Sequence, residues 1–287
     1  MAKRMDVRKT YKLYIGGKFP RTESGRYYKW NSTKDDEVVN ICLGSRKDFR
    51  DAVVAARKAF DPWQSRTAYN RGQILYRIGE ILEGRRDQFL AELTLQGVPK
   101  REATREMNAA IDRLIYYAGW ADKYQQLFSS VNPVAQPYFN YSTPEATGVV
   151  SIVAPEESSM LGLVTAIAPV IVGGNSCVVL ASHSKPLCSI SFAEVLQTSD
   201  VPPGVVNILT GQRSELLEQF ASHMDVNAVS YFGDDSGEIK TVEENASLNV
   251  KRVAILPEKD LQKSGAQGPY HILKTQEIKT TWHPIGV

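Results

Sequence analysis

The sequence predicts an α/β fold: a Rossmann-like five-stranded parallel sheet with helices on both faces, a helical N-terminal part and a β-arm for oligomerisation. Helical stretches at about 159–172, 186–198, 213–222 and 236–247 separate apolar runs of strand length. Continuous Val/Ile/Leu strands joined by helices are typical of a buried parallel sheet with right-handed crossovers. The five predicted strands are 148–154, 176–181, 204–210, 226–232 and 251–256.

The N-terminal part, residues 1–130, is predicted to be a hairpin followed by helices that pack on the sheet domain. Residues 11–19 alternate around Gly16-Gly17, which predicts a short hairpin in a surface lead-in, and a turn-rich region follows up to about residue 45. Apolar residues then recur at helical spacing, with Pro62 and Pro99 as breaks. The predicted helices are 48–60, 66–96 and about 100–126, and we interpret their large side chains as packing: Trp63, Tyr76, Tyr116 and Trp120.

The C-terminal segment departs from the strand–helix alternation. Residues 270–282 form one β-prone run after a polar linker at 262–268, and an earlier strand is predicted at 138–141. A terminal strand without a sequence neighbour exposes an edge, which proteins cover by pairing, often with another chain. We therefore group 131–147 with 269–287 as an arm beside the sheet domain, residues 148–260.

The composition excludes several classes of protein. The chain has 287 residues, 43% of them hydrophobic, and a formal charge of +2, so it can bury a core and carries no electrostatic signal for nucleic acid. No run approaches the roughly 18 apolar residues of a membrane span. The three cysteines, an odd number without metal-ligand spacing, favour a reducing compartment, and we expect a cytoplasmic protein: Cys42, Cys177 and Cys188.

Four acidic residues follow two of the predicted strands. Glu156 and Glu157 come after the first strand, and Asp234 and Asp235 after the fourth. Ligands of parallel sheets bind outside the carboxyl ends of the strands. The group could bind a divalent cation, prevent nucleotide entry or be solvated charge, and solvated charge is the default. The histidines and cysteines predict no metal site, and Cys188, at a helix start, is the best candidate nucleophile, although packing is favoured.

The order of motifs resembles the aldehyde dehydrogenase superfamily. The similarity runs along nearly the whole chain, and the segment 138–141 matches the strand with which the family's C-terminal oligomerisation strand pairs. The motifs, in family order, are Tyr14-Ile15-Gly16-Gly17, Gly148-Val149-Val150, Gly174-Asn175, Pro186-Leu187, Pro202-Pro203-Gly204-Val205-Val206-Asn207, Lys251-Arg252-Val253 and the tail from Tyr270 to Lys279.

Set against the resemblance, the catalytic domain is expected to be absent, because only the linker 262–268 stands where the domain with the nucleophilic cysteine belongs. Glu156 and Glu157 replace the Trp-Asn pair whose Asn binds the oxyanion, and an ionised Glu is acceptor-only. Asp234 and Asp235 follow the glycine that meets the pyrophosphate, and an Asp cap supplies its own anion. Other positions also differ: Leu180 replaces the ribose-binding Lys, His183 its acidic neighbour and Leu256 the general base.

No catalytic residue is therefore predicted. Pro155, Gly211 and Gly233 keep family positions, and the resemblance implies that they are vestigial cofactor contacts. No cofactor is expected on the isolated chain, although weak NAD binding is possible.

One type of family member is most similar: the non-catalytic second module of the two-module, family 16 type. The similarity lies in Tyr11–Tyr14, Phe19–Arg26, Tyr231–Gly233 and Trp282–Gly286. It implies a non-catalytic subunit that assembles with a catalytic aldehyde dehydrogenase chain through the arm and the 138–141 strand, or a homo-oligomer. Two alternatives stay open: an NAD-binding subunit of an aldehyde-oxidising complex, and an independent nucleotide- or metabolite-binding module.

Overall fold

The computed structural model describes residues 9–32, 37–256 and 259–286. Its centre is the predicted parallel sheet, with strand order β7-β6-β5-β8-β9. Every residue of β5, β6, β7 and β8 is buried, as expected for strands covered on both faces. The strand bounds are β5 Val149–Val153, β6 Ser176–Leu180, β7 Val206–Leu209, β8 Ala228–Phe232 and β9 Arg252–Leu256.

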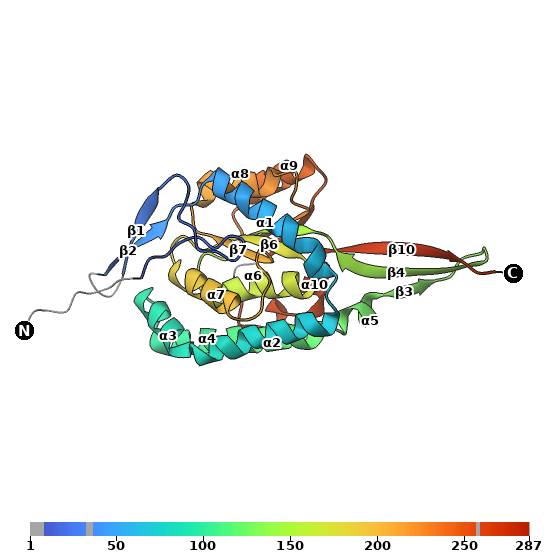
Figure 1. The fold of residues 1–287 in the computed structure, drawn as a ribbon, viewed down its shortest axis with the longest axis horizontal. Helices are drawn as coiled ribbons and strands as arrows, with labels where there is room; N and C mark the ends of the chain where they lie inside the picture. Colours follow the sequence, from blue (N-terminus) through green and yellow to red (C-terminus); the bar gives the residue numbers. More distant parts are fainter. Residues whose placement is uncertain (1–8, 33–36, 257–258, 287) are drawn as a thin grey trace, which may run out of the picture.

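Helices cover both faces of this sheet (Figure 1). On one face, helices α1, α8 and α9 pack on the strands, and Phe49 of α1 stacks on Phe220 of α8 with ring centroids 4.1 Å apart. On the other face lie α6 and α7, with α2, α3 and α4 as a second layer. The bounds are α1 Arg46–Gln64, α2 Ala68–Gly84, α3 Arg86–Leu95, α4 Lys100–Trp120, α5 Tyr124–Phe128, α6 Leu161–Val172, α7 Leu187–Gln197, α8 Arg213–Ser222 and α9 Ser236–Ser247.

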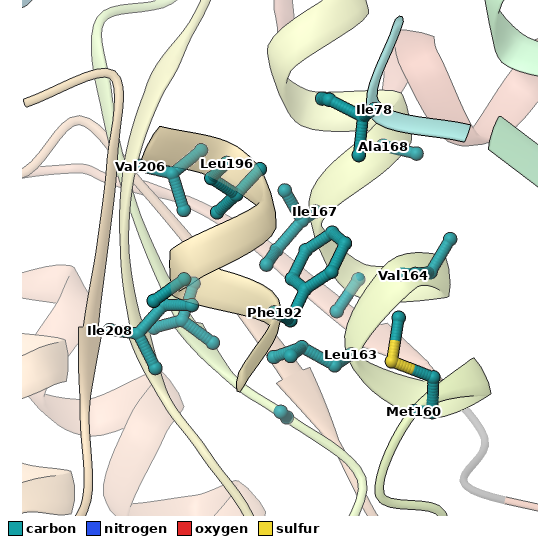
Figure 2. Close-up of a cluster of buried hydrophobic side chains, with 14 of the residues drawn as sticks. Ile78, Met160, Leu163, Val164, Ile167, Ala168, Phe192, Leu196, Val206 and Ile208 are labelled. Atoms are coloured by element: carbon teal, nitrogen blue, oxygen red, sulfur yellow. The ribbon is translucent and has the colours of Figure 1, made fainter. Parts of the chain in front are cut away.

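The larger core lies between α6, α7 and the sheet (Figure 2). Phe192 of α7 points toward Ile167 of α6, and Ile78 reaches the same cluster from the second helical layer. These side chains are almost completely buried, and burying one of this size contributes about 1.5–3 kcal/mol. The helical N-terminal part is thus held on the sheet domain by a shared apolar core.

The N-terminal lead-in differs from the prediction in two ways. The turn at Gly16-Gly17 forms, with Ile15 and Lys18 exchanging hydrogen bonds, but Tyr14 is buried and pairs with Ile208 at the edge of β7. The lead-in therefore covers a sheet edge with its buried residues, Leu13 and Tyr14, while Lys18 at its turn stays exposed, so the prediction of a surface segment is only partly correct. The turn-rich region contains an antiparallel hairpin that the sequence analysis missed, β1 Tyr27–Asn31 and β2 Val38–Cys42.

The helix predictions are correct in position and wrong in detail. The stretch 66–96 is two helices that separate at Arg85, and Pro62 lies inside α1, where the helix continues to Gln64. Pro99 does precede a helix, as the N-cap of α4. Tyr76 is 58% exposed, so its interpretation as a packing residue is wrong, whereas Trp63 is fully buried.

The arm is a three-stranded antiparallel sheet with order β10-β4-β3 that projects from the body (Figure 1). The predicted run 270–282 begins as a short helix and becomes a strand only from Gln276. That strand pairs with β4 along its whole length, from Gln276 opposite Ala146 to Pro284 opposite Tyr138. The bounds are β3 Ser130–Asn132, β4 Tyr138–Ala146, α10 Pro269–Leu273 and β10 Gln276–Pro284.

A prediction concerns Gly148, which opens β5 with a φ of +134°. A Cβ atom there would lie 2.1 Å from Oδ1 of Asn227, which accepts hydrogen bonds from Val149 N and Arg57. Gly148→Ala should lower the free energy of unfolding by about 2–4 kcal/mol, from backbone strain plus the displaced amide. Urea denaturation measures this. Gly119→Ala, in α4 with open space around it, should change stability by less than about 1 kcal/mol, and equal effects would contradict the prediction.

Candidate functional site

The carboxyl ends of β5 and β8 define the candidate site. The two strands are parallel neighbours at the centre of the sheet. After β5 the chain adds β6 and β7 on one side of β5, and it then returns to add β8 and β9 on the other side. The carboxyl ends of this strand pair are therefore the point where the strand order reverses, and open α/β sheets bind ligands in a crevice at that point. The helices that follow these strands begin at the same edge, so the edge also collects helix N-termini with unpaired N–H groups.

Glu156, the first of the acidic residues after β5, binds this chain's own backbone. Its carboxylate accepts hydrogen bonds from the N–H groups of Ser184 at 2.6 Å and His183 at 3.1 Å. Burial opposes ionisation of Glu156, but these N–H groups, the Ser184 hydroxyl and the Arg213 guanidinium together hold its pKa below the usual value. Glu156 therefore acts as an internal anion for the loop after β6.

The other three acidic residues have separate partners. Glu157 is 77% exposed at its side chain and pairs with Lys185, and Asp234 pairs with Lys259 on the surface. Asp235 caps α9 by accepting from Glu238 N at 2.8 Å, as the sequence predicted for an Asp at a helix start. Within the described ranges no three acidic, His or Cys side chains converge on a possible metal position, so the cation hypothesis gains no support.

Helix α6 is capped by a residue that the sequence analysis missed. It has no side-chain cap of its own, and Glu106 of α4, which is buried, accepts hydrogen bonds from Met160 N at 2.9 Å and Leu161 N at 3.1 Å. Similarly, Gln96 accepts from Leu187 N, at the start of α7, at 2.9 Å. No local motif could have indicated either contact, because the residues are more than 50 positions apart.

The three residues interpreted as vestigial cofactor contacts lie at the carboxyl edge but face this chain's own atoms. Pro155 packs closely on Gly162: a Cβ atom added to Gly162 would lie 3.0 Å from the Pro155 ring. Gly211 is also closely packed, because a Cβ added there would lie 2.8 Å from Leu216 and 3.6 Å from Leu180. The N–H of Gly233 donates to Leu256 O at 3.1 Å. Leu180, which the resemblance sets at the position of the family's ribose-binding Lys, is buried and packs in the core.

The β1–β2 hairpin covers the loop after β6. The Tyr28 ring stacks on His183 at 4.3 Å between centroids, and the Tyr28 hydroxyl donates to His183 O at 3.1 Å. Trp30 donates from Nε1 to Ser184 O at 2.7 Å. The loop after β6 is thus bound by the Glu156 carboxylate and also by two aromatic residues of β1. The alternation of residues 27–31 is the signal that could have indicated this strand.

The cysteines are packing residues. All three are buried, and complete burial raises the pKa of the Cys177 and Cys188 thiols far above the usual value. A thiol with a raised pKa is not a nucleophile at neutral pH. The helix start at Cys188 therefore does not activate it, and the interpretation of these cysteines as buried apolar residues agrees with their surroundings.

Comparison with known proteins identifies the class. The fold and crevice define an α/β domain of the dinucleotide-binding type, and residues 19–256 match the model of the aldehyde dehydrogenase family. The chain belongs to this family. Human aldehyde dehydrogenase 1A1 is 31% identical over 254 residues, covering 85% of this chain and 49% of the relative. Mouse cytosolic 10-formyltetrahydrofolate dehydrogenase is 29% identical over 260 residues, covering 88% of this chain and 29% of the relative.

Solved structures give the same result. A betaine aldehyde dehydrogenase variant from Staphylococcus aureus, solved in complex with NAD+, superposes with a TM-score of 0.81 at 26% identity and covers 86% of this chain and 50% of its own. An aldehyde dehydrogenase from Burkholderia cenocepacia, described as putative, reaches 0.82. The chain spans about half the length of most of these relatives. In the described parts of the chain, no helix has the length and apolarity to cross a membrane.

We predict that Glu106→Ala lowers the free energy of unfolding by about 2–4 kcal/mol, because two buried N–H groups of α6 and the Ser158 hydroxyl lose their acceptor. Chemical denaturation measures the loss. Glu102→Ala, an exposed neighbour in the first turn of α4, should cost less than about 1 kcal/mol. Comparable losses for the two variants would mean that the cap is not important for stability.

A second prediction concerns pH. Because the folded pKa of Glu156 is lowered, its stabilising effect is complete above its unfolded pKa, near 4.3, and is lost as the pH falls through the lower folded value. Glu156→Gln should cost about 1–3 kcal/mol at pH 7, and the difference from wild type should shrink below about pH 4. Denaturation curves between pH 3 and 7 give both quantities. A pH-independent difference would contradict the role of the charge.

Proposed function

We propose that the protein is a non-catalytic subunit of the aldehyde dehydrogenase family that assembles with a catalytic, NAD-dependent chain and braces it. The arm is the observation that carries this proposal. Strand β10 is the outer strand of its sheet, and the arm projects away from the core that holds the rest of the fold. An unpaired strand edge is a surface that another chain can extend by β-pairing.

The faces of the arm also favour a partner. Ile278 and Trp282, four positions apart on β10, share a face and are 56% and 57% exposed. Tyr138 lies against Trp282 with ring centroids 5.8 Å apart, and Phe139 is exposed on β4. Several large apolar side chains on a thin, projecting sheet are typical of a protein–protein interface.

The chemistry at the carboxyl edge supports a non-catalytic role. Glu156 and Glu157 stand where the resemblance requires an oxyanion donor, and Leu256 stands at the position of the general base. The described cysteines are buried in the core. These departures are those expected of the second module of the family 16 type, and we infer that this chain corresponds to that module.

An NAD-binding subunit is the second candidate. The retained fold and the positions of Pro155, Gly211 and Gly233 favour it, as does the NAD+ complex of the Staphylococcus relative. Leu180 and the Asp235 cap argue against it, because they remove a cation and a free helix N-terminus from the places where a dinucleotide needs them.

The test is co-expression with a full-length aldehyde dehydrogenase chain of the same organism. We expect a stable complex, measured by size-exclusion chromatography with light scattering, and at least a tenfold weaker one for Ile278→Lys/Trp282→Lys, which puts charges on the exposed face of β10. The matched control is Val54→Lys, 61% exposed on α1, which should leave assembly unchanged. The proposal would be contradicted if wild type stayed monomeric or formed only homo-oligomers. It would also be contradicted if the Ile278→Lys/Trp282→Lys variant bound the catalytic chain as tightly as wild type.

A further inference from the structure

The side chain of Arg213 crosses the crevice between β5 and β8. Arg213 opens helix α8, directly after the loop that follows β7. Its Nη2 atom donates to Ala154 O at 2.7 Å, just beyond β5, and to Phe232 O at 3.4 Å, the last residue of β8. One guanidinium therefore joins the carboxyl ends of the two strands that flank the switch point.

The remaining donors of this guanidinium are directed at carboxylates. Nη1 donates to Glu238 at 3.2 Å, and Nε lies 4.0 Å from Glu156. The Tyr231 ring lies below, 5.7 Å from the guanidinium carbon, and its hydroxyl donates to Glu238 at 2.6 Å. Arg213 is 18% exposed at its side chain, so the guanidinium is largely enclosed by the two carbonyls and two carboxylates that it faces.

A bound dinucleotide would need the same place and the same kind of contacts. Its pyrophosphate binds where N–H donors and a helix N-terminus face the crevice. Here the donors of Arg213 are directed at this chain's own oxygens, Asp235 caps α9, and the N–H of Gly233 is bonded to Leu256. The Tyr231 hydroxyl would lie 2.5 Å from a Cβ on Gly233, so the tyrosine covers the glycine as well.

We propose that Arg213 is an intramolecular occupant of the dinucleotide crevice: with Glu156 and Glu238 it holds β5 and β8 together and excludes the pyrophosphate of a nucleotide. This assigns the exclusion to the guanidinium of Arg213 and the carboxylates that hold it, and removing this pair of groups is expected to open the crevice. The inference goes beyond the proposed function and does not depend on it, because the network is complete within one chain and needs no partner.

The experiment is isothermal titration calorimetry of the full chain with NAD+ and with ADP as probes. Wild type should bind neither probe measurably at about 1 mM, a concentration that detects dissociation constants in the millimolar range. Arg213→Ala/Glu238→Gln removes the guanidinium and one of the carboxylates that would repel phosphate, and it should gain at least tenfold in affinity for both probes. Arg213→Lys keeps a charge but cannot bridge both carbonyls, and it should gain less.

The control is Arg57→Ala, which removes an arginine that bridges Asp225 and Asn227 at the amino ends of the strands and should leave nucleotide affinity unchanged. Equal affinity of wild type and the folded double variant, whether both bind or neither does, would overturn the proposal. Hydrogen exchange of wild type gives a readout that does not depend on variant folding. With 5 mM NAD+, we expect no added protection at residues 154–156 and 232–236, and protection there would also overturn the proposal.

Discussion

The carboxyl edge of the parallel sheet imposes the constraint on which the rest of this structure depends. Four strands and the four helices that follow them place carbonyl groups, N–H groups and helix dipoles at one edge, and these groups need partners. Enzymes of this fold class leave some of them free for a ligand. In this chain Glu156, Glu106 and Asp235 accept from N–H groups, and Arg213 donates to carbonyls. These N–H and carbonyl groups are therefore satisfied from within the chain.

That internal satisfaction links stability to function. A carboxylate at a helix N-terminus stabilises the helix and at the same time occupies the place of a phosphate, so a single substitution can strengthen the fold and weaken a cofactor site. Leu180 packs against the loop at Gly211, and it is the residue that the resemblance sets at the position of a ribose-binding cation. Under the proposal for Arg213, the crevice serves this chain as a structural centre.

The arm has the opposite character. The strands of the arm pair with one another, but one edge of β10 has no strand beside it and large side chains of β10 are exposed. The arm therefore has an accessible surface for binding, in contrast to the carboxyl edge of the parallel sheet, whose groups bind one another. A chain whose carboxyl edge makes internal contacts and whose arm is exposed is suited to the assembly that we propose. The physical basis of the proposed function is this contrast between the two ends of the molecule.

The sequence by itself determined the parallel sheet and its connecting helices, because apolar runs report local periodicity. The pairing of the C-terminal strand with 138–141, which the structure contains, was implied by the resemblance to the family and not by periodicity. It also predicted the Asp235 cap, a contact between residues three positions apart in the sequence. Only the tertiary structure decided how Glu106, Gln96 and Arg213 complete the edge. Their partners lie 19 to 91 positions away, and hydrophobic patterning carries no information about polar contacts across such separations. The missed β1–β2 hairpin is a different case: the alternating residues 27–31 carried a local signal for the strand, and only its docking on the loop after β6 depends on long-range contacts.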